Sequence, residues 1–143
     1  MKDLSQIAEI IEAEINNTSY LKDPENLYSP IEYTMEFGGK RIRPILLLIS
    51  YQLFNDNIER AFSPAKAIEI FHNFTLLHDD IMDKAPLRRG KITVHKKWNN
   101  NIAILSGDVM MIHAYQLLTQ VESKYLKTIL NIFNKAAIEV CEG

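Results

Sequence analysis

The sequence predicts an all-α protein in which residues 1–143 form a single helical unit. Two observations favour this fold class. Apolar residues recur at the three- and four-residue spacing of helices in nearly every segment between turn signals, and no repeat, low-complexity tract or linker divides the chain. A chain of 143 residues that is 47% hydrophobic and 24% charged, with a net charge of −2, also has the composition of one globular domain.

The first two helices are predicted from a periodic stretch and from a capping signal. Residues 4–17 carry a leucine and four isoleucines at helical spacing, and Asn16-Asn17 marks the end. Ser29 followed by Pro30 is typical of an N-cap with proline at the first helical position, and Gly38-Gly39 ends that short helix. We therefore expect the second helix to begin at Ser29.

Four further helices are expected along the rest of the chain. Pro44 opens a segment over residues 45–54, and Ser63-Pro64 starts a long segment that runs through Asp83. Residues 85–101 are polar and contain a proline and a glycine, so they are predicted to form a loop. The last two helices are expected at residues 102–119 and 122–142.

Composition and charge exclude several functional classes. No basic excess argues for nucleic acid, and the first residues, MKDLSQIAEIIEAE, carry acids where a secretory signal needs a basic and then an apolar region. The longest apolar run, residues 44–50, is far shorter than the roughly 20 residues of a membrane span. We expect a cytoplasmic protein without a transmembrane segment. The single cysteine, Cys141, excludes an internal disulfide and a cysteine-based zinc site.

Three aspartates lie within an otherwise apolar segment, LLHDDIMD. On a helical wheel Asp79 and Asp83 stand about 40° apart and Asp80 lies within about 100° of both, so the three carboxylates share one flank. They repel one another, because no lysine or arginine lies between them. One interpretation is a solvated helix end. The other is a Mg²⁺ site shared with a substrate diphosphate, since clustered carboxylate oxygens suit a hard divalent ion.

Two basic clusters could meet such a diphosphate. In GGKRIRP, Lys40, Arg41 and Arg43 follow two glycines and precede a helix N-terminus, which is the geometry of an anion site. In LRRGK, Arg88 and Arg89 follow Asp83 across a turn and could fold back over the aspartates. Solvated basic turns remain the alternative. Both clusters together predict two separate polyanion pockets.

His72 lies within about 20° of Asp79 on the helical wheel, seven residues earlier in the chain. A lone helical histidine is either a satisfied core residue or a ligand. Its alignment with the aspartates keeps both interpretations open.

Four motifs in order resemble the N-terminal part of trans-prenyl diphosphate synthases, the polyprenyl synthetase family. They are GGKRIRP, EIFHNFTLLHDDIMD, LRRGKITVH and AILSGD. The resemblance covers essentially the whole chain. It implies an antiparallel helical bundle of the isoprenoid synthase type, of which this sequence would supply the N-terminal half.

The resemblance implies a prenyltransferase that joins isopentenyl diphosphate to an allylic diphosphate, releases pyrophosphate and depends on Mg²⁺. By match to the family motifs, the metal ligands would be Asp79, Asp80 and Asp83, which together with Arg88 form the implied catalytic set. Arg88 would hold the allylic diphosphate. The diphosphate of isopentenyl diphosphate would be held by Lys40, Arg43, His72 and Arg89.

The length of the prenyl product is predicted less directly than the reaction. An aromatic residue five positions before Asp79, here Phe74, resembles short-chain synthases that make C15 to C20 products and would form the floor of the tail pocket. The helical wheel, however, places Phe74 about 140° from Asp79 and Thr75 only about 40° from it. Geometry alone therefore favours Thr75 as the residue beneath the aspartates.

The resemblance also implies a second Asp-rich motif, which this sequence lacks. We therefore expect a chain that cannot elongate a substrate alone and that self-associates or forms a homodimer through uncovered apolar helix faces. Two other functions stay open. One is a non-catalytic subunit that pairs with a complete synthase. The other is a helical HD-type metal phosphohydrolase, which would use His72 and His78-Asp79 with His95 and His113.

Overall fold

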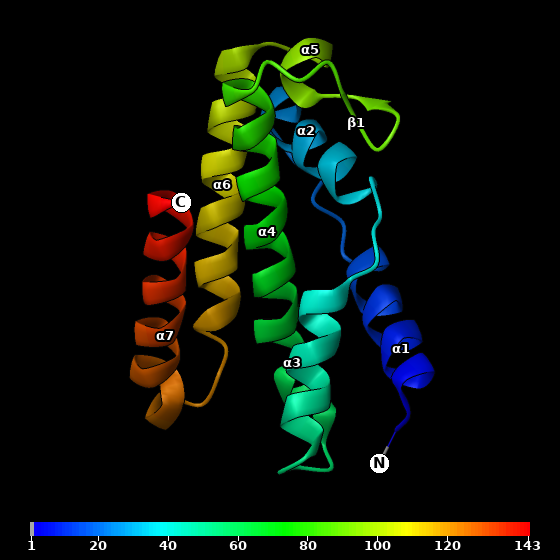
Figure 1. Ribbon diagram of the computed structural model, residues 1–143, viewed down its shortest axis with the longest axis vertical. Coiled ribbons are helices and arrows are strands. Elements are labelled where there is room, and N and C mark those ends of the chain that lie inside the picture. Colours follow the sequence, from blue (N-terminus) through cyan, green and yellow to red (C-terminus); the bar gives the residue numbers. More distant parts are fainter. Residues whose placement is uncertain (1) are drawn as a thin grey trace.

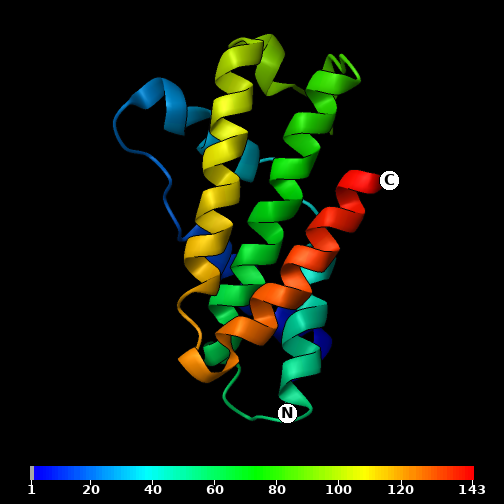
Figure 2. The same cartoon turned by 90° about the vertical axis from the view of Figure 1, so that its left-hand side faces the viewer.

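An antiparallel pair of helices, α4 (Phe62–Met82) and α6 (Asn100–Leu118), forms the centre of the protein, as the computed structural model of residues 2–143 shows (Figure 1). Helices α1 to α3 lie on one side of α4 and α7 lies on the other, next to α6 (Figures 1 and 2). The remaining elements in the described residues are α1 (Leu4–Asn16), α2 (Glu25–Met35), α3 (Ile42–Gln52), the 3-10 helix η1 (Ile58–Ala61), β1 (Leu87–Arg88), β2 (Lys91–Ile92), α5 (Val94–Lys97) and α7 (Ser123–Glu142).

Helices α4 and α6 pack closely because a glycine of one faces a histidine of the other. A β-carbon at Gly107 would lie 2.7 Å from Cδ2 of the His78 ring. The His78 Nε2 in turn lies 3.2 Å from the carbonyl oxygen of Ile104. The two helices are antiparallel, so this contact brings the carboxyl end of α4 beside the amino end of α6 (Figure 1).

The core lies where α1, α2 and α3 meet the central pair. The predicted periodicity of α1 is confirmed, since its buried residues are Ile7, Ile11 and Ile15. The helix starts at a capping box in which the Asp3 carboxylate accepts a hydrogen bond from the backbone N–H of Gln6 at 2.9 Å. Burial of one face of each helix fixes the positions of the helix ends that carry the polar motifs.

The predicted start of the second helix is wrong. Helix α2 begins at Glu25, with Pro24 at the N-cap position, and Pro30 lies inside it. Proline removes one hydrogen bond from a helix interior, but Pro30 is fully buried and Glu25 stabilises the first turn electrostatically. Tertiary packing therefore extends the helix upstream past the local Ser29-Pro30 signal. Helix α3 likewise starts at Ile42, earlier than predicted.

Residues 85–101 are more ordered than the predicted loop, because they contain a two-stranded hairpin and the short helix α5. At the hairpin turn Arg89 and Gly90 have positive φ angles of 51° and 78°. The hairpin rests on α2, since the Tyr33 hydroxyl donates a hydrogen bond to the Ile92 carbonyl oxygen at 2.8 Å. The hairpin, which follows the carboxyl end of α4 in the chain, is thereby fixed against α2 (Figure 1).

Helix α7 covers the central pair only in part, and Phe133 is its single buried residue. Helices α6 and α7 expose large apolar side chains, namely Ile104, Leu105, Ile112, Tyr125, Ile132, Ile138 and Val140. Within residues 2–143, no helix combines the length and the hydrophobicity that a membrane crossing requires.

Candidate functional site

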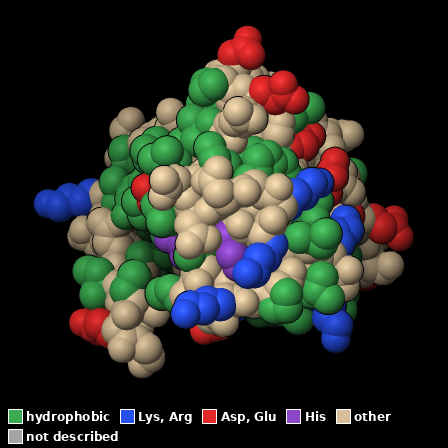
Figure 3. All heavy atoms as spheres, turned by 90° about the horizontal axis from the view of Figure 1, so that it is seen from above, with side chains coloured by type: hydrophobic (Ala, Val, Ile, Leu, Met, Phe, Trp, Pro, Cys, Tyr) green, Lys and Arg blue, Asp and Glu red, His purple; other side chains and the backbone are tan. Residues whose placement is uncertain are grey.

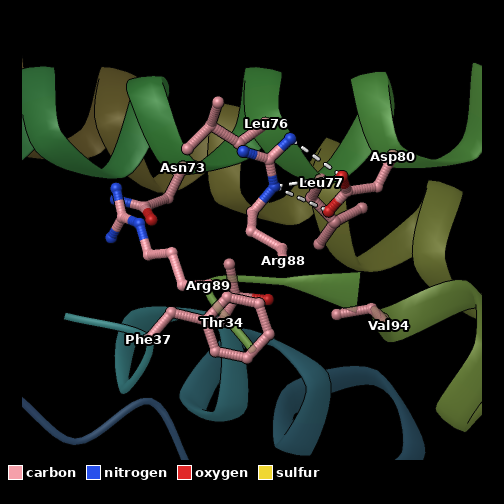
Figure 4. Close-up of a pocket in the computed structure, with 9 residues that line it drawn as sticks. All are labelled: Thr34, Phe37, Asn73, Leu76, Leu77, Asp80, Arg88, Arg89 and Val94. Carbon is pink, nitrogen blue, oxygen red and sulfur yellow. Dashed lines mark hydrogen bonds and ion pairs between the residues drawn. The ribbon is translucent and has the colours of Figure 1, made fainter. Parts of the chain in front are cut away.

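The three aspartates at the end of α4 have different environments. The Asp80 side chain is only 5% exposed and accepts three hydrogen bonds from the Arg88 guanidinium, from Nε at 3.0 and 2.9 Å and from Nη2 at 2.8 Å (Figure 4). Asp79 and Asp83 are exposed. The sequence motif therefore contains one carboxylate that anchors an arginine and two that face outward.

Arg88 lies in the field of all three carboxylates. The hydrogen bonds to Asp80 raise the pKa of the Arg88 guanidinium, and the negative charges of Asp80, Asp79 and Asp83 raise it further, in opposition to partial burial. The predicted folding of the LRRGK segment over the aspartates is thus present in the structure. Arg88 is held as a permanent cation at the end of α4.

A magnesium ion fits two of the three carboxylates. Mg²⁺ keeps several waters and is usually bound by one or two carboxylates together with substrate phosphates. Asp79 and Asp83 are exposed oxygen donors one helical turn apart, whereas the oxygens of Asp80 are engaged by Arg88. Among residues 2–143, no three acidic, histidine or cysteine side chains converge closely enough to enclose a metal by themselves. A metal at Asp79 and Asp83 would therefore need further ligands from substrate and water.

The GGKRIRP loop separates its three cations. Lys40 and Arg43 are exposed, while Arg41 turns inward and is 5% exposed. Arg41 has left-handed backbone angles, φ 47° and ψ 32°, at the N-cap of α3. Its guanidinium donates to Glu69 Oε1 at 2.7 Å and to Glu12 Oε2 at 3.2 Å. Two of the three cations in the motif are thus available to an anion, and the third is part of the core.

His72 lies among the basic groups, as the predicted diphosphate pocket requires. Burial lowers the pKa of the His72 imidazole, and the positive charges of Arg43, Arg89 and Arg88 lower it further, while Glu69 acts in the opposite direction. His72 is therefore neutral at pH 7 in the free protein. Figure 3 looks onto the end of the molecule that carries the hairpin and α5, the helix of His95, and shows Lys and Arg side chains beside recessed histidine atoms.

Arg89 connects the hairpin to the glycine loop. A β-carbon at Gly39 would lie 2.5 Å from Nη1 of Arg89, so the guanidinium rests directly on the Gly39 backbone. Arg88 and Arg89 both line a small pocket whose other walls include Asn73 and Asp80 (Figure 4). The two arginines extend in different directions, Arg88 toward Asp80 and Arg89 toward the side of Asn73 (Figure 4). The two predicted basic clusters therefore meet over α4.

A groove of about 1110 Å³ runs along α4 between α3 and α7. Arg43, His72 and Asp79 line its polar end, which is the half of the groove nearer the carboxyl end of α4, and most of the remaining lining is apolar. Asp79 and Pro64 lie at opposite ends of the α4 lining and are separated by 15 residues, which at a rise of 1.5 Å per residue gives a length of about 22 Å. The groove thus has a polar half and a mainly apolar half, and the ion pair between Arg60 and Glu122 also lines it.

The two candidates for the floor of this groove occupy different places. Thr75 lines the groove with Asp79, in keeping with the helical wheel. Phe74 is absent from the lining; its ring packs against the His78 ring at 4.7 Å and the Phe71 ring at 5.5 Å, measured between centroids. Phe71 does line the groove and contacts the Phe133 ring of α7 at 4.9 Å.

Several residues of the site have no signal in the sequence motifs. Glu69 and Asn73 are buried on α4. Glu69 accepts a hydrogen bond from Arg41, and Asn73 Nδ2 donates to Glu69 Oε1 at 3.2 Å. Glu69 could have been found, because a buried face position with a glutamate requires a cation. Tyr51 of α3 also lines the groove, which only the packing of α3 against α4 determines.

The histidines do not assemble the site of an HD-type phosphohydrolase. His113 packs between the rings of Tyr20 and Tyr28, at 6.4 Å from each centroid, and His95 lines a separate depression near Trp98. Neither contributes to the groove that contains His72. The described residues therefore do not support that alternative.

Comparison with known proteins defines the class to which this fold and site belong. Residues 24–143 match the polyprenyl synthetase family, so the chain belongs to that family. A crystal structure of a geranylgeranyl pyrophosphate synthase is 44% identical, with a TM-score of 0.94 over 99% of this chain and 43% of that chain. The predicted family and the predicted all-α helical bundle are both confirmed.

Two curated relatives are similar over most of this chain. A short chain isoprenyl diphosphate synthase of Methanocaldococcus jannaschii is 41% identical over 126 residues, which are 87% of this chain and 38% of that protein. A geranylgeranyl diphosphate synthase of Methanosarcina mazei is 37% identical over 135 residues, which are 93% of this chain and 42% of that protein. The chain therefore spans about two fifths of the length of these relatives.

Proposed function

We propose that this chain carries the diphosphate-binding part of a short-chain prenyl diphosphate synthase. One observation carries the proposal: a single groove has Arg43, His72 and Asp79 in one half and a mostly apolar lining along the rest. This arrangement suits an amphiphile with an anionic head and a hydrocarbon tail. The two relatives, a short-chain isoprenyl diphosphate synthase and a geranylgeranyl diphosphate synthase, agree with such a ligand.

In the proposed reaction the bond between the allylic carbon and its diphosphate oxygen breaks and pyrophosphate leaves. The double bond of isopentenyl diphosphate then attacks the allylic carbon, and the departing pyrophosphate takes the proton that is lost. Arg88, fixed by Asp80, binds the allylic diphosphate and stabilises the charge that develops on it. Asp79 and Asp83 would hold Mg²⁺, which when bound neutralises negative charge on the same leaving group.

The second diphosphate is assigned to the remaining basic groups. Lys40, Arg43 and Arg89 supply charge, and neutral His72 supplies a ring N–H that can donate a hydrogen bond. A bound diphosphate would offset the positive charges that lower the His72 pKa, so binding should raise this pKa and be accompanied by proton uptake. Two diphosphates side by side account for the number of cations at this end of α4.

We further propose that the product is of C15 to C20 length and that Thr75 contacts the growing tail, because Thr75 lines the groove one turn below Asp79. Phe74 would act on tail length only through Phe71, which it contacts. In a full-length enzyme that includes this chain, Thr75→Phe should shorten the products, as read by chromatography of the dephosphorylated alcohols. Unchanged product lengths would contradict the role of Thr75.

We propose that the 143-residue chain by itself binds a diphosphate but does not elongate a substrate. Titration calorimetry with inorganic diphosphate tests binding, and incubation with isopentenyl and geranyl diphosphates and Mg²⁺ tests turnover. Replacing Lys40 or Arg43 by glutamine should weaken binding about tenfold or more, whereas Lys127→Gln, on exposed α7, should not. Robust turnover would contradict the inactivity. A folded chain that binds no diphosphate would contradict the function and favour a non-catalytic partner subunit.

We also propose that the chain self-associates. Ile104, Leu105 and Ile112 are 42%, 54% and 54% exposed on α6, and α7 adds Ile138 at 58%. Exposed apolar residues gathered on adjacent helices are typical of protein interfaces. Light scattering should give a mass above that of the 16.5 kDa monomer, and Leu105→Glu should lower it. A monodisperse wild-type monomer would refute the proposal.

A further inference from the structure

We propose that Arg41 is a positioning residue: its ion pair with Glu69 fixes the GGKRIRP loop on α4 and thereby places Lys40 and Arg43 for diphosphate binding. This inference rests on the proposed function. The structure places Arg41 in the core, whereas the sequence motif alone groups it with the exposed residues Lys40 and Arg43.

Arg41 binds three different helices. Its guanidinium donates to Glu12 Oε2 of α1 at 3.2 Å, to the Met35 carbonyl oxygen at the end of α2 at 3.2 Å, and to Glu69 Oε1 of α4 at 2.7 Å. The Arg41 and Glu69 side chains are 3% and 6% exposed. A single side chain therefore joins the start of α3 to α1, α2 and α4.

The connection reaches α4 at the turn that carries His72. Glu69 precedes His72 by three residues, and Asn73, which follows it, donates to Glu69 Oε1 at 3.2 Å. On the loop side, Arg43 lies two residues after Arg41, at the second position of α3. Arg43 and His72 both line the polar end of the groove. The Arg41–Glu69 bond thus sets the separation of two side chains that the proposed function assigns to one diphosphate.

Stability does not explain this arrangement well. A buried ion pair is often no more stabilising than apolar side chains of similar volume, because both charges lose their hydration. Arg41 also occupies the left-handed backbone region, which is unfavourable for residues other than glycine. The buried charge and the left-handed backbone thus coincide at Arg41, next to Lys40 and two residues before Arg43. Strained residues of this kind concentrate at ligand-binding sites, where the surrounding structure holds them in place.

An apolar replacement of the pair separates positioning from stability. The double variant Arg41→Met with Glu69→Leu removes both charges, so it should melt near the wild-type temperature. It should nevertheless shift or broaden the amide NMR signals of Gly38 and Gly39, and lower the affinity for inorganic diphosphate about tenfold. The matched control is Lys66→Met with Glu14→Leu, a second pair between α4 and α1 that lies away from the loop. It should change neither readout.

Arg41→Lys provides an independent test should the double variant fail to fold. Lysine keeps the charge but has one nitrogen in place of the guanidinium fork, so it cannot bind all three partners in the same geometry. We expect a folded protein with intermediate Gly38 and Gly39 shifts and an affinity between those of the wild type and the double variant. Either variant with wild-type glycine signals and wild-type affinity would overturn the inference. A wild-type chain that binds no diphosphate would overturn the proposed function instead, while the glycine signals would still report on the loop.

Discussion

Replacing Asp80 by asparagine should destabilise the fold, whereas the same change at Asp79 or Asp83 should not. The Asp80 side chain is 5% exposed and engages Arg88 by three hydrogen bonds of 2.8 to 3.0 Å. Asparagine is nearly isosteric but has one oxygen and no charge. The variant therefore removes the charge to which the Arg88 guanidinium is hydrogen-bonded and leaves it only the charges of Asp79 and Asp83.

The expected loss follows from the geometry of this ion pair. Hydrogen bonds between charged groups contribute about 1.5 to 3 kcal/mol, and Arg88 is 26% exposed, so part of its charge is rehydrated. We expect a loss of about 2 kcal/mol, which for a chain of 143 residues corresponds to a fall in Tm of about 6 °C. Asp79→Asn and Asp83→Asn each relieve a repulsion between exposed like charges and should stabilise by a few tenths of a kcal/mol.

Urea and thermal unfolding followed by circular dichroism measure all three variants. The double variant Asp80→Asn with Arg88→Gln should lose little more than Asp80→Asn alone, because the interaction is already broken. Equal destabilisation by Asp79→Asn and Asp80→Asn, or an Asp80→Asn variant as stable as the wild type, would refute the assignment of Asp80 as the anchor of Arg88. In diphosphate titrations with Mg²⁺, Asp79→Asn should weaken binding without lowering Tm.

Three further predictions concern other contacts of the site. The folded-state pKa of His72 lies below the ordinary value of about 6.5, so the imidazole of the unfolded chain is protonated first as the pH falls. The contribution of His72 to the free energy of unfolding should therefore be full above about pH 6.5 and fall as the pH decreases toward the folded-state pKa. Urea unfolding at pH 5 to 8 measures this dependence. Gly107→Ala should displace the His78 ring and cost about 1 to 3 kcal/mol of unfolding free energy. Gly39→Ala should displace Arg89 and weaken diphosphate binding in calorimetry, since the new β-carbon would meet the guanidinium.

Each of these predictions has a control. His72→Gln should flatten part of the pH dependence, and an unchanged slope would assign it to other groups such as His113, whose pKa burial also lowers. Ala103→Gly, in the same helix as Gly107, should weaken α6 without moving the His78 signals in NMR spectra. Gly38→Ala shares the positive φ of the loop but meets no neighbour within 4 Å, so it should retain more diphosphate affinity than Gly39→Ala.

The sequence predicted most of the helices because their apolar periodicity survives in the folded protein. The predicted range 4–17 differs by one residue from α1, and the predicted end of the long helix at Asp83 is the C-cap of α4. Local signals failed where packing outweighed them. Pro30 is accommodated inside α2 because it is fully buried, so the Ser29 start was wrong.

The motifs of the site were also visible in the sequence, since charged residues in an apolar context require a partner. Four motifs in order predicted the family, and the match over residues 24–143 confirms it. The roles assigned to individual side chains stay predictions. The residue types in the motifs and their spacing along the chain are enough to indicate diphosphate chemistry.

Only the tertiary structure decided which charges face the solvent. Asp79 and Asp80 are neighbours in sequence, and so are Lys40 and Arg41, yet one of each pair is exposed and the other is buried. Helical spacing gives the direction of a side chain, but its partner comes from another part of the fold: Arg88 of β1 binds Asp80 of α4, and Arg41 at the start of α3 binds Glu69 of α4. Burial depends on such long-range packing, because desolvation of a charge is tolerated only where an opposite charge arrives within hydrogen-bond distance.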